Sequence, residues 1–203
     1  MSWLFYFWID NLFSEKIHMN RKAFTLIELL VVVAIIGILA AVGVVAYNGY
    51  TGAAKVNATK ANHKSVCKWT NSELVKCELD NSSNIFNGQI NCSTITSKLG
   101  QNQQDAANEM AKELEKGLKD KFKNPYGEYR NPSTNDYKSD NAVTRAGWGK
   151  DRDLGYTIIE STTHPTTGKA RLNIHTCNKL SCVGDWWNNT NDNIEICLIE
   201  VQQ

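Results

Sequence analysis

Residues 29–46 read LLVVVAIIGILAAVGVVA, a run of 18 positions without a charged or strongly hydrogen-bonding side chain. At this length a membrane-spanning helix is the expected structure. Twelve of the positions are Leu, Ile or Val, which on an insertion scale contribute on the order of −4 to −7 kcal/mol in total. A buried helix of a soluble protein is the alternative, but such helices rarely need apolar residues on every face. The run therefore predicts a helix that is retained in a bilayer.

Charge is distributed very unevenly around this run. The 203-residue chain has 22 Lys plus Arg and 21 Asp plus Glu, yet residues 24–54 contain a single charged side chain, Glu28. The net charge of +1 excludes a general polyanion binder, because affinity for nucleic acid comes largely from many Lys and Arg residues that neutralise phosphates. The segregation of charge also argues against a soluble enzyme, whose charged residues would be spread evenly along the chain.

Basic residues immediately before the run predict its orientation. Arg21 and Lys22 precede it, and the positive-inside rule keeps such an end in the cytoplasm. The chain from Lys55 onward is then expected outside. This is the side on which disulfides persist, and it carries all of the cysteines: Cys67, Cys77, Cys92, Cys177, Cys182 and Cys197.

Residues 19–47, MNRKAFTLIELLVVVAIIGILAAVGVVAY, resemble the leader and N-terminal helix of type IV pilins and of their relatives, the type II secretion pseudopilins. The resemblance implies that prepilin peptidase cuts between Ala23 and Phe24 and that Phe24 becomes the N-methylated first residue. It also implies that Glu28, whose carboxylate is costly to bury unpaired, pairs with the terminal amine of a neighbouring subunit. Gly37 matches a glycine at which filament helices approach closely or loosen, with ordinary helix packing as the alternative.

The chain departs from the family pattern in three places. Ala23 stands where the family most often has Gly, and Gly43 begins a Gly-Val-Val run where many members have Pro. Residues 1–18 form an extra segment, so we expect translation to start at Met19, with a long leader as the alternative. In either case residues 1–23 are removed. The mature chain then has 19 basic and 19 acidic residues and is formally neutral.

The sequence predicts three parts: a leader at 1–23, a transmembrane or filament-core helix at 24–54, and an exterior globular head at 55–203. The helical pattern continues through residues 47–77 without Pro. One face of it carries a stripe that would pack against the head, formed by Val56, His63, Cys67 and Leu74. The membrane helix is therefore expected to extend into an amphipathic stem.

The middle of the head is expected to hold a loop and a second helix. Residues 78–100 are rich in Asn, Ser and Gly and predict a connecting loop with short strands at most. Residues 104–122 predict an amphipathic helix that stops before Asn124-Pro125. Its apolar residues recur at steps of three and four: Ala107, Met110, Leu114, Leu118 and Phe122.

The last third of the chain predicts strands. Residues 155–160, 169–177 and 194–201 have strand composition and are separated by turn-rich segments. Three or four antiparallel strands would then lie on the stem helix. The fold class is α+β, with a long apolar helix, an amphipathic stem and a small antiparallel sheet, which is also the head that the resemblance implies.

Disulfide pairing is predicted from loop length. Short loops are the easiest to close, which favours the pairs Cys77–Cys92 and Cys177–Cys182. Cys67 and Cys197 remain. Cys197 alternates with Ile199 and Val201 on one strand face, and Cys67 lies on the apolar face of the stem. A bond between them would join helix to sheet.

Candidates for other ligands are few, and no cofactor is expected. A zinc site is the alternative use of the cysteines, but the sequence contains no Cys-x-x-Cys, and no ligand spacing is formed by His18, His63, His164 and His175. A calcium ion could be held by oxygen atoms, although a polar hairpin loop explains the same residues: Asn188, Asn191, Asp192 and Glu195.

Nucleic acid is not expected as a partner. A basic helix end is one candidate surface, formed by Lys112, Lys116, Lys119, Lys121 and Lys123. Acidic residues alternate with these lysines and neutralise them: Glu109, Glu113, Glu115 and Asp120.

The expected function is that of a structural subunit rather than an enzyme. The resemblance implies cleavage by prepilin peptidase and storage in inner-membrane lipid. It further implies assembly by the inner-membrane pilus machinery into a helical homopolymer, a type IV pilus at the cell surface that serves adhesion, twitching motility or DNA uptake. A type II secretion pseudopilin is the alternative, favoured by the Asn-Pro-Tyr-Gly run at 124–127, whereas the six cysteines favour a pilin. A membrane-anchored enzyme is a second alternative, but no nucleophile, base and acid set or metal motif supports it.

Overall fold

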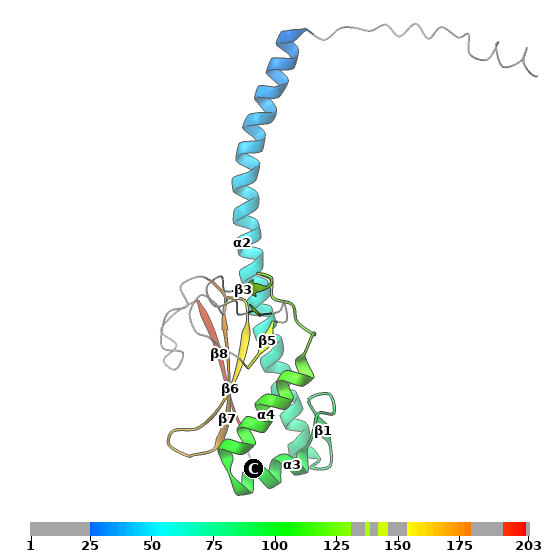
Figure 1. Cartoon of the computed structure of the whole chain (residues 1–203), viewed down its shortest axis with the longest axis vertical. Helices are drawn as coiled ribbons and strands as arrows, with labels where there is room; N and C mark the ends of the chain where they lie inside the picture. The colour runs from blue at the N-terminus through cyan, green and yellow to red at the C-terminus, as the bar shows by residue number, and fades with distance from the viewer. Residues whose placement is uncertain (1–24, 131–136, 139–141, 146–153, 180–192, 202–203) are drawn as a thin grey trace, which may run out of the picture. The chain divides into compact units, whose positions relative to one another are not determined.

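A computed structural model of the 203-residue chain describes residues 25–130, 137–138, 142–145, 154–179 and 193–201. The chain divides into two units, one up to Tyr47 and one from Asn48 onward. The boundary expected from composition lay a little later, between residues 54 and 55. Figure 1 shows the order of the elements along the chain.

The longest element is helix α2, Leu26–Leu79, which runs unbroken through Gly37 and Gly43. The helix is therefore continuous at both glycines in this single chain. Every residue of α2 up to Tyr50 is exposed, whereas the later part has a buried face. Three of the four predicted stripe residues are buried and the fourth, Val56, is half-buried. The buried set is Thr59, His63, Val66, Cys67, Thr70, Glu73 and Leu74, which confirms the amphipathic stem.

The segment after α2 differs from the expected loop. It contains the short hairpin of β1 (Asn84–Ile85) and β2 (Ile90–Asn91), as expected, and then helix α3, Cys92–Gln101, which was not predicted. Ile95 and Leu99 are the buried residues that follow its first position. Two apolar positions four residues apart are too few to stand out from a polar composition, which is why the sequence pattern missed this helix.

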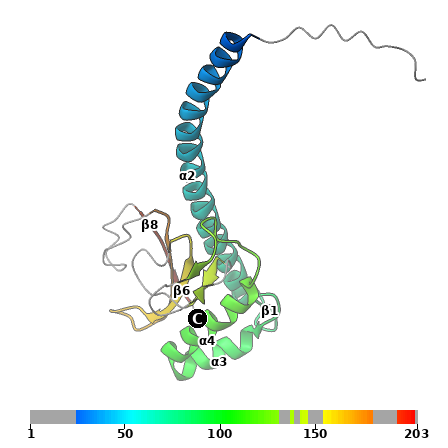
Figure 2. The same ribbon diagram turned by 45° about the horizontal axis from the view of Figure 1, so that its top comes forward.

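The predicted second amphipathic helix is α4, Gln103–Leu118, and its buried face carries Ala107, Met110, Leu114 and Leu118. It ends before Phe122, the last residue of the expected stripe. Asp120 has φ +62°, a left-handed conformation that does not continue a helix. The helices α3 and α4 contact each other and lie next to each other in Figure 2.

The three predicted strands are confirmed as β6 (Thr157–Thr163), β7 (Ala170–Cys177) and β8 (Ile194–Glu200). They belong to a four-stranded sheet in the order β5-β6-β7-β8, with β5 at Val143–Thr144. The pairs β6–β7 and β7–β8 are antiparallel, but β5 pairs with β6 in parallel. The sheet is therefore mixed, a correction to the all-antiparallel expectation. A separate pair is formed by β3 (Tyr129–Arg130) and β4 (Tyr137–Lys138).

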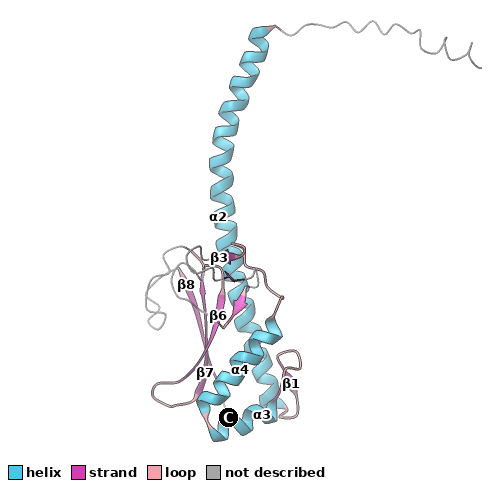
Figure 3. Cartoon of the chain, in the orientation of Figure 1, coloured by secondary structure: helices cyan, strands magenta, loops and turns pink. Residues whose placement is uncertain are grey.

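The core of the head lies between its helices and one face of the sheet. Helix α4 contacts β6 and β7, and residues of α2, α3, α4 and the sheet share one buried apolar cluster. Figure 3 shows the helices and the strands as separate groups. The observed class, α+β with a long apolar N-terminal helix, agrees with the prediction.

Candidate functional site

The start of α2 is organised by Thr25 and Glu28. The backbone N–H of Thr25 and its hydroxyl each donate to Glu28 Oε2 at 2.8 Å, and the Glu28 N–H donates to Thr25 Oγ1 at 3.3 Å. This is the reciprocal arrangement of a capping box, Thr-x-x-Glu, which satisfies donors that the first turn of a helix leaves free. The Thr-x-x-Glu spacing of Thr25 and Glu28 is visible in the sequence and is the signal that predicts such a cap.

The predicted cleavage site is the pair Ala23 and Phe24, which lies outside the described residues. Thr25 is therefore the first described residue, and it lies one position beyond the terminus that cleavage would create. Glu28, the predicted assembly residue, is exposed and placed in the first turn of α2.

The first half of α2 presents a large apolar surface. Its Leu, Ile and Val side chains from Leu26 to Val45 are each at least 48% exposed. In the described part of the chain, α2 alone is long and apolar enough to cross a membrane, by length and composition. An apolar surface of this extent is a site of contact with lipid or with other protein chains.

Gly37 lies in the middle of this surface. A Cβ atom built on it would meet no atom within 4 Å, and the same holds for Gly43. Nothing in the described chain therefore requires a glycine at either position. A close approach by another helix is the packing role that a missing side chain serves at such a place.

The stem joins the sheet through buried polar contacts. His63 Nδ1 lies 3.0 Å from Thr176 Oγ1, and the Thr176 hydroxyl donates to Thr157 Oγ1 at 2.9 Å. At the edge of the same junction Lys60 and Glu195 form an ion pair at 2.9 Å. Burial lowers the pKa of His63, although nearby Glu195 partly opposes this. The stem is thus fixed directly to β7 and β8, and through Thr176 to β6, by directed contacts as well as by apolar packing.

The cysteines follow the prediction in part. Cys77 and Cys92 form a disulfide with a Cα–Cα distance of 5.2 Å, as expected. Cys177 is also disulfide-bonded, and its predicted partner, Cys182, lies outside the described residues. The structure differs for the pair Cys67 and Cys197, which are free thiols. No disulfide joins them: Cys67 lies in the buried apolar cluster of the head, and Cys197 packs against that cluster.

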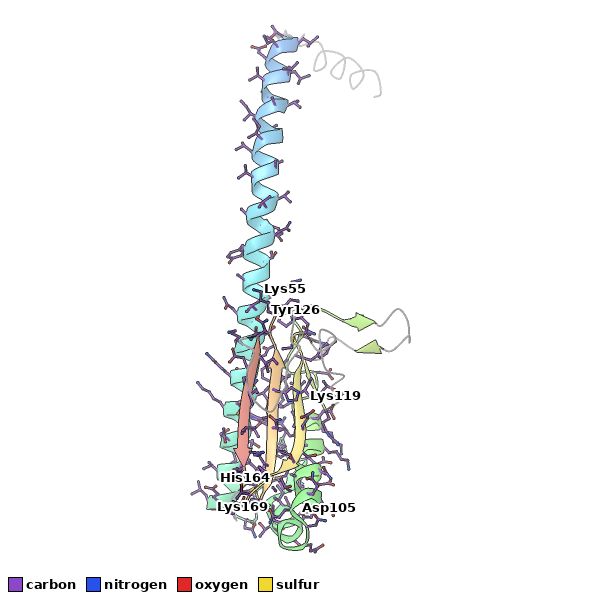
Figure 4. All side chains as sticks on the ribbon, turned by 90° about the vertical axis from the view of Figure 1, so that its left-hand side faces the viewer. Lys55, Asp105, Lys119, Tyr126, His164 and Lys169 are labelled. Carbon is purple, nitrogen blue, oxygen red and sulfur yellow. A yellow bond between two sulfur atoms is a disulfide. The ribbon has the colours of Figure 1, made fainter. Side chains whose placement is uncertain are left out.

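The Asn-Pro-Tyr-Gly run at 124–127 has a structural use in the head. Asn124 Oδ1 accepts from the Tyr126 N–H at 2.9 Å and its Nδ2 donates to the Leu154 carbonyl at 3.0 Å. The Tyr126 hydroxyl donates to the carbonyl of Asn178 at 2.8 Å. Lys55 Nζ lies 5.5 Å from the centroid of the Tyr126 ring, and Figure 4 shows the two residues side by side. The run therefore links the stem to the end of β7.

Of the four calcium candidates, Asn188, Asn191 and Asp192 lie outside the described residues, and Glu195 pairs with Lys60. Within the described ranges no group of three or more His, Cys, Asp or Glu residues could hold a metal ion.

Two of the five lysines at the basic end of α4, Lys112 and Lys116, pair with acidic neighbours. Lys112 and Lys116 each lie near Glu113, at 3.8 and 2.6 Å, and Lys112 lies 3.7 Å from Glu109. Lys121 lies over the ring of Trp69 at 5.1 Å. These contacts give the lysines structural partners within the head.

Comparison with known proteins identifies the N-terminal region. Residues 18–44 match the family model of the prokaryotic N-terminal methylation motif, which includes the Ala23–Phe24 pair, Glu28 and Gly37. No solved structure matches the chain. The head therefore has no counterpart among these matches, and the family evidence lies in the N-terminal helix. The chain carries the prepilin-type leader and N-terminal methylation motif of type IV pilins and pseudopilins.

Proposed function

We propose that the protein is a structural, non-catalytic subunit of a type IV pilus, which prepilin peptidase cuts before Phe24 and which polymerises through α2. The observation that carries this proposal is the conjunction of the methylation motif with a helix that leaves its whole N-terminal half exposed. A surface of this kind needs a cover. Lipid supplies the cover before assembly, and neighbouring copies of α2 supply it afterwards.

Polymerisation follows from the position of the apolar surface. Every copy has the same helix, and a head-to-tail contact that does not close into a ring extends into a helical filament. Gly37 favours the close approach of a neighbouring helix, because no atom of the described chain fills the space beside it. The filament core is then a bundle of apolar helices, and the heads form its outer surface.

Glu28 gives the assembly its register in this proposal. Cleavage before Phe24 leaves a terminal amine close in sequence to the carboxylate. In a dry filament core an unpaired charge is unfavourable, so the amine of one subunit and Glu28 of a neighbour are expected to pair. The capping-box contacts from Thr25 leave Glu28 Oε1 for this partner, because both donate to Oε2.

The proposed location follows the same order of events. Arg21 and Lys22 keep the leader in the cytoplasm, where the peptidase acts, and the head with its disulfide lies outside the inner membrane. Inner-membrane pilus machinery then moves the subunit from lipid to the filament. Adhesion, twitching motility and DNA uptake would be properties of that filament.

A type II secretion pseudopilin is the alternative that a specific observation favours. The run at 124–127 resembles a motif of major pseudopilins, and its Tyr126 contacts both Lys55 of the stem and the carbonyl of Asn178, just after β7. Deletion of the gene separates the two. Loss of surface filaments, seen by electron microscopy and reversed by complementation, supports the pilus. Intact filaments with a secretion defect would support the pseudopilus.

A further inference from the structure

Strand β8 runs along the stem in register with the turns of α2. Glu195 pairs with Lys60 at 2.9 Å, Cys197 packs against the apolar cluster that contains Cys67, and Val201 lines the same cavity as Leu74. The six-residue step along the strand is about 20 Å, and the fourteen-residue step along the helix is about 21 Å. One face of β8 therefore meets successive turns of α2, as Figure 4 shows for the two elements.

The middle contact of this register is the thiol pair. Cys67 is buried and Cys197 is half-buried, and both are free. The two cysteines affect each other's titration: Cys197, together with burial, raises the pKa of Cys67, whereas Cys67 lowers the pKa of Cys197. The thiolate therefore forms first on the cysteine that solvent and other proteins can reach, and thiolates are the form that attacks disulfides.

His63 is placed one helical turn before Cys67 to accept the second proton. The Thr176 hydroxyl donates to Thr157, so its oxygen is available to accept from His63 Nδ1–H. The other ring nitrogen, Nε2, is then unprotonated, and it lies 3.6 Å from Cys67 Sγ. Burial keeps the imidazole neutral by lowering its pKa, although Glu195 opposes this and Lys64 supports it. Lys60 completes the charged groups at this junction.

We propose that Cys67 and Cys197 form a redox site that closes into a disulfide once β8 has docked on α2, with His63 as the base for Cys67. The thiolate of Cys197 attacks the disulfide of a protein oxidant and forms a mixed disulfide, and one oxidant sulfur leaves as a thiolate. Cys67 then loses its proton to His63 Nε2 and attacks the Cys197 sulfur. The second oxidant sulfur leaves, so that the two cysteine thiols are oxidised and the oxidant becomes a dithiol.

The closed bond would join the stem to the last strand of the sheet. It would close a loop that contains nearly the whole head, and the loss of unfolded-state freedom grows with loop length. Because α2 is the element through which the proposed filament transmits tension, the bond would prevent β8 from peeling away from the stem. The reduced and oxidised subunits would share one fold and differ in resistance to pulling.

The full-length protein, exported in a bacterial host and extracted in detergent, tests the site directly. Free thiols are blocked with an alkylating agent under denaturing conditions, and peptides are mapped by mass spectrometry without reduction. After incubation with oxidised glutathione, a Cys67–Cys197 linked peptide is expected beside the Cys77–Cys92 peptide. Alkylation of both Cys67 and Cys197 in protein whose Cys77–Cys92 bond is intact would overturn the proposal. Neither result depends on filament formation, so this test stands apart from that of the proposed function.

The role of His63 needs a readout that folding alone does not change. His63→Gln is expected to slow closure about tenfold or more at neutral pH, since it removes a positioned base. Raising the pH should restore most of the rate in this variant, because hydroxide then deprotonates Cys67 without the imidazole. The matched variant His164→Gln, on the β6–β7 turn, should close at the wild-type rate. Equal rates for His63→Gln and wild type at neutral pH would exclude the base role, and so would a slow rate that raising the pH leaves unchanged.

Discussion

The hydroxyl and the backbone N–H of Thr25 both donate to the same oxygen of Glu28, each at 2.8 Å. Glu28 thus has a local role at the start of α2 in addition to the intersubunit pairing proposed for it. The two roles differ in what they require. A capping box needs an acceptor oxygen, which Gln also supplies, whereas pairing with a terminal amine needs a negative charge.

Glu28→Gln separates these roles. The variant should enter the membrane and be cut by prepilin peptidase, because the apolar run and the cleavage site are unchanged. It should lose most filament yield, since the amide carries no charge to pair with the neighbouring amine. Immunoblots of sheared filaments against whole cells measure this directly.

Thr25→Ala is the matched control for the Glu28 variant. It removes the hydroxyl of the capping box but keeps the carboxylate, so filaments should form at a yield near that of the wild type. If Glu28→Gln assembled normally and Thr25→Ala did not, helix capping rather than charge pairing would be the function of Glu28.

Loss of the Cys77–Cys92 disulfide should destabilise the head. The bond joins the end of α2 to the start of α3, across a sequence separation of 15 residues. A loop of this size corresponds to about 3 kcal/mol in the chain-entropy account. Cys77→Ser in full-length protein should lower the thermal midpoint measured by circular dichroism in detergent. An unchanged midpoint would show that the bond contributes little to folding.

Gly155→Ala should be strongly destabilising, because the position combines two constraints. Its φ is +81°, and a Cβ atom would collide with the side chain of Asn124. Gly168 has φ +67° but open space around it, so Gly168→Ala carries the backbone strain alone, about 1–3 kcal/mol. We expect the Gly155 variant to lose clearly more stability than the Gly168 variant in urea unfolding. Equal losses would mean that Asn124 moves aside at little cost.

Glu73 is the buried carboxylate that fixes the hairpin of β1 and β2. It accepts from the Phe86 N–H at 2.7 Å and pairs with Lys76. Phe86 and Asn87 have φ of +55° and +61°, so the hairpin backbone needs such support. Glu73→Ala should cost about 1–3 kcal/mol, since it leaves a buried donor unsatisfied. The exposed Glu78→Ala on the same helix should be near neutral, and a similar loss in both variants would contradict the assigned role.

Hydrophobic patterns that extend over many residues made much of this structure predictable. The apolar run predicted the first half of α2, the stripe of His63, Cys67 and Leu74 predicted its second half, and period two predicted β6, β7 and β8. Helix α3 was not predicted because its buried face has few apolar residues among Ser and Thr. The parallel strand β5 was not predicted because a strand of two residues is too short to show an alternating apolar pattern.

The site could be predicted where it depends on composition and not where it depends on local geometry. Glu28 stands out in the sequence as the single charged residue of an apolar segment. Its contacts with Thr25 depend on where the helix begins, which the structure shows. Cys67 and Cys197 were placed together by their faces on helix and strand. The position of His63 beside them depends on the exact register of β8 along α2, which the spacing of residues in one element does not determine.

Mass spectrometry of protein from sheared surface filaments measures processing and assembly together. The proposed function predicts a mature chain that begins at N-methylated Phe24, recovered in the extracellular filament fraction. Removal of residues 1–23 would confirm the cleavage site. Recovery of the protein in the extracellular filament fraction would confirm polymerisation of the cut subunit. A chain in that fraction that begins at Met1 or Met19, or an unmethylated terminus elsewhere, would contradict it.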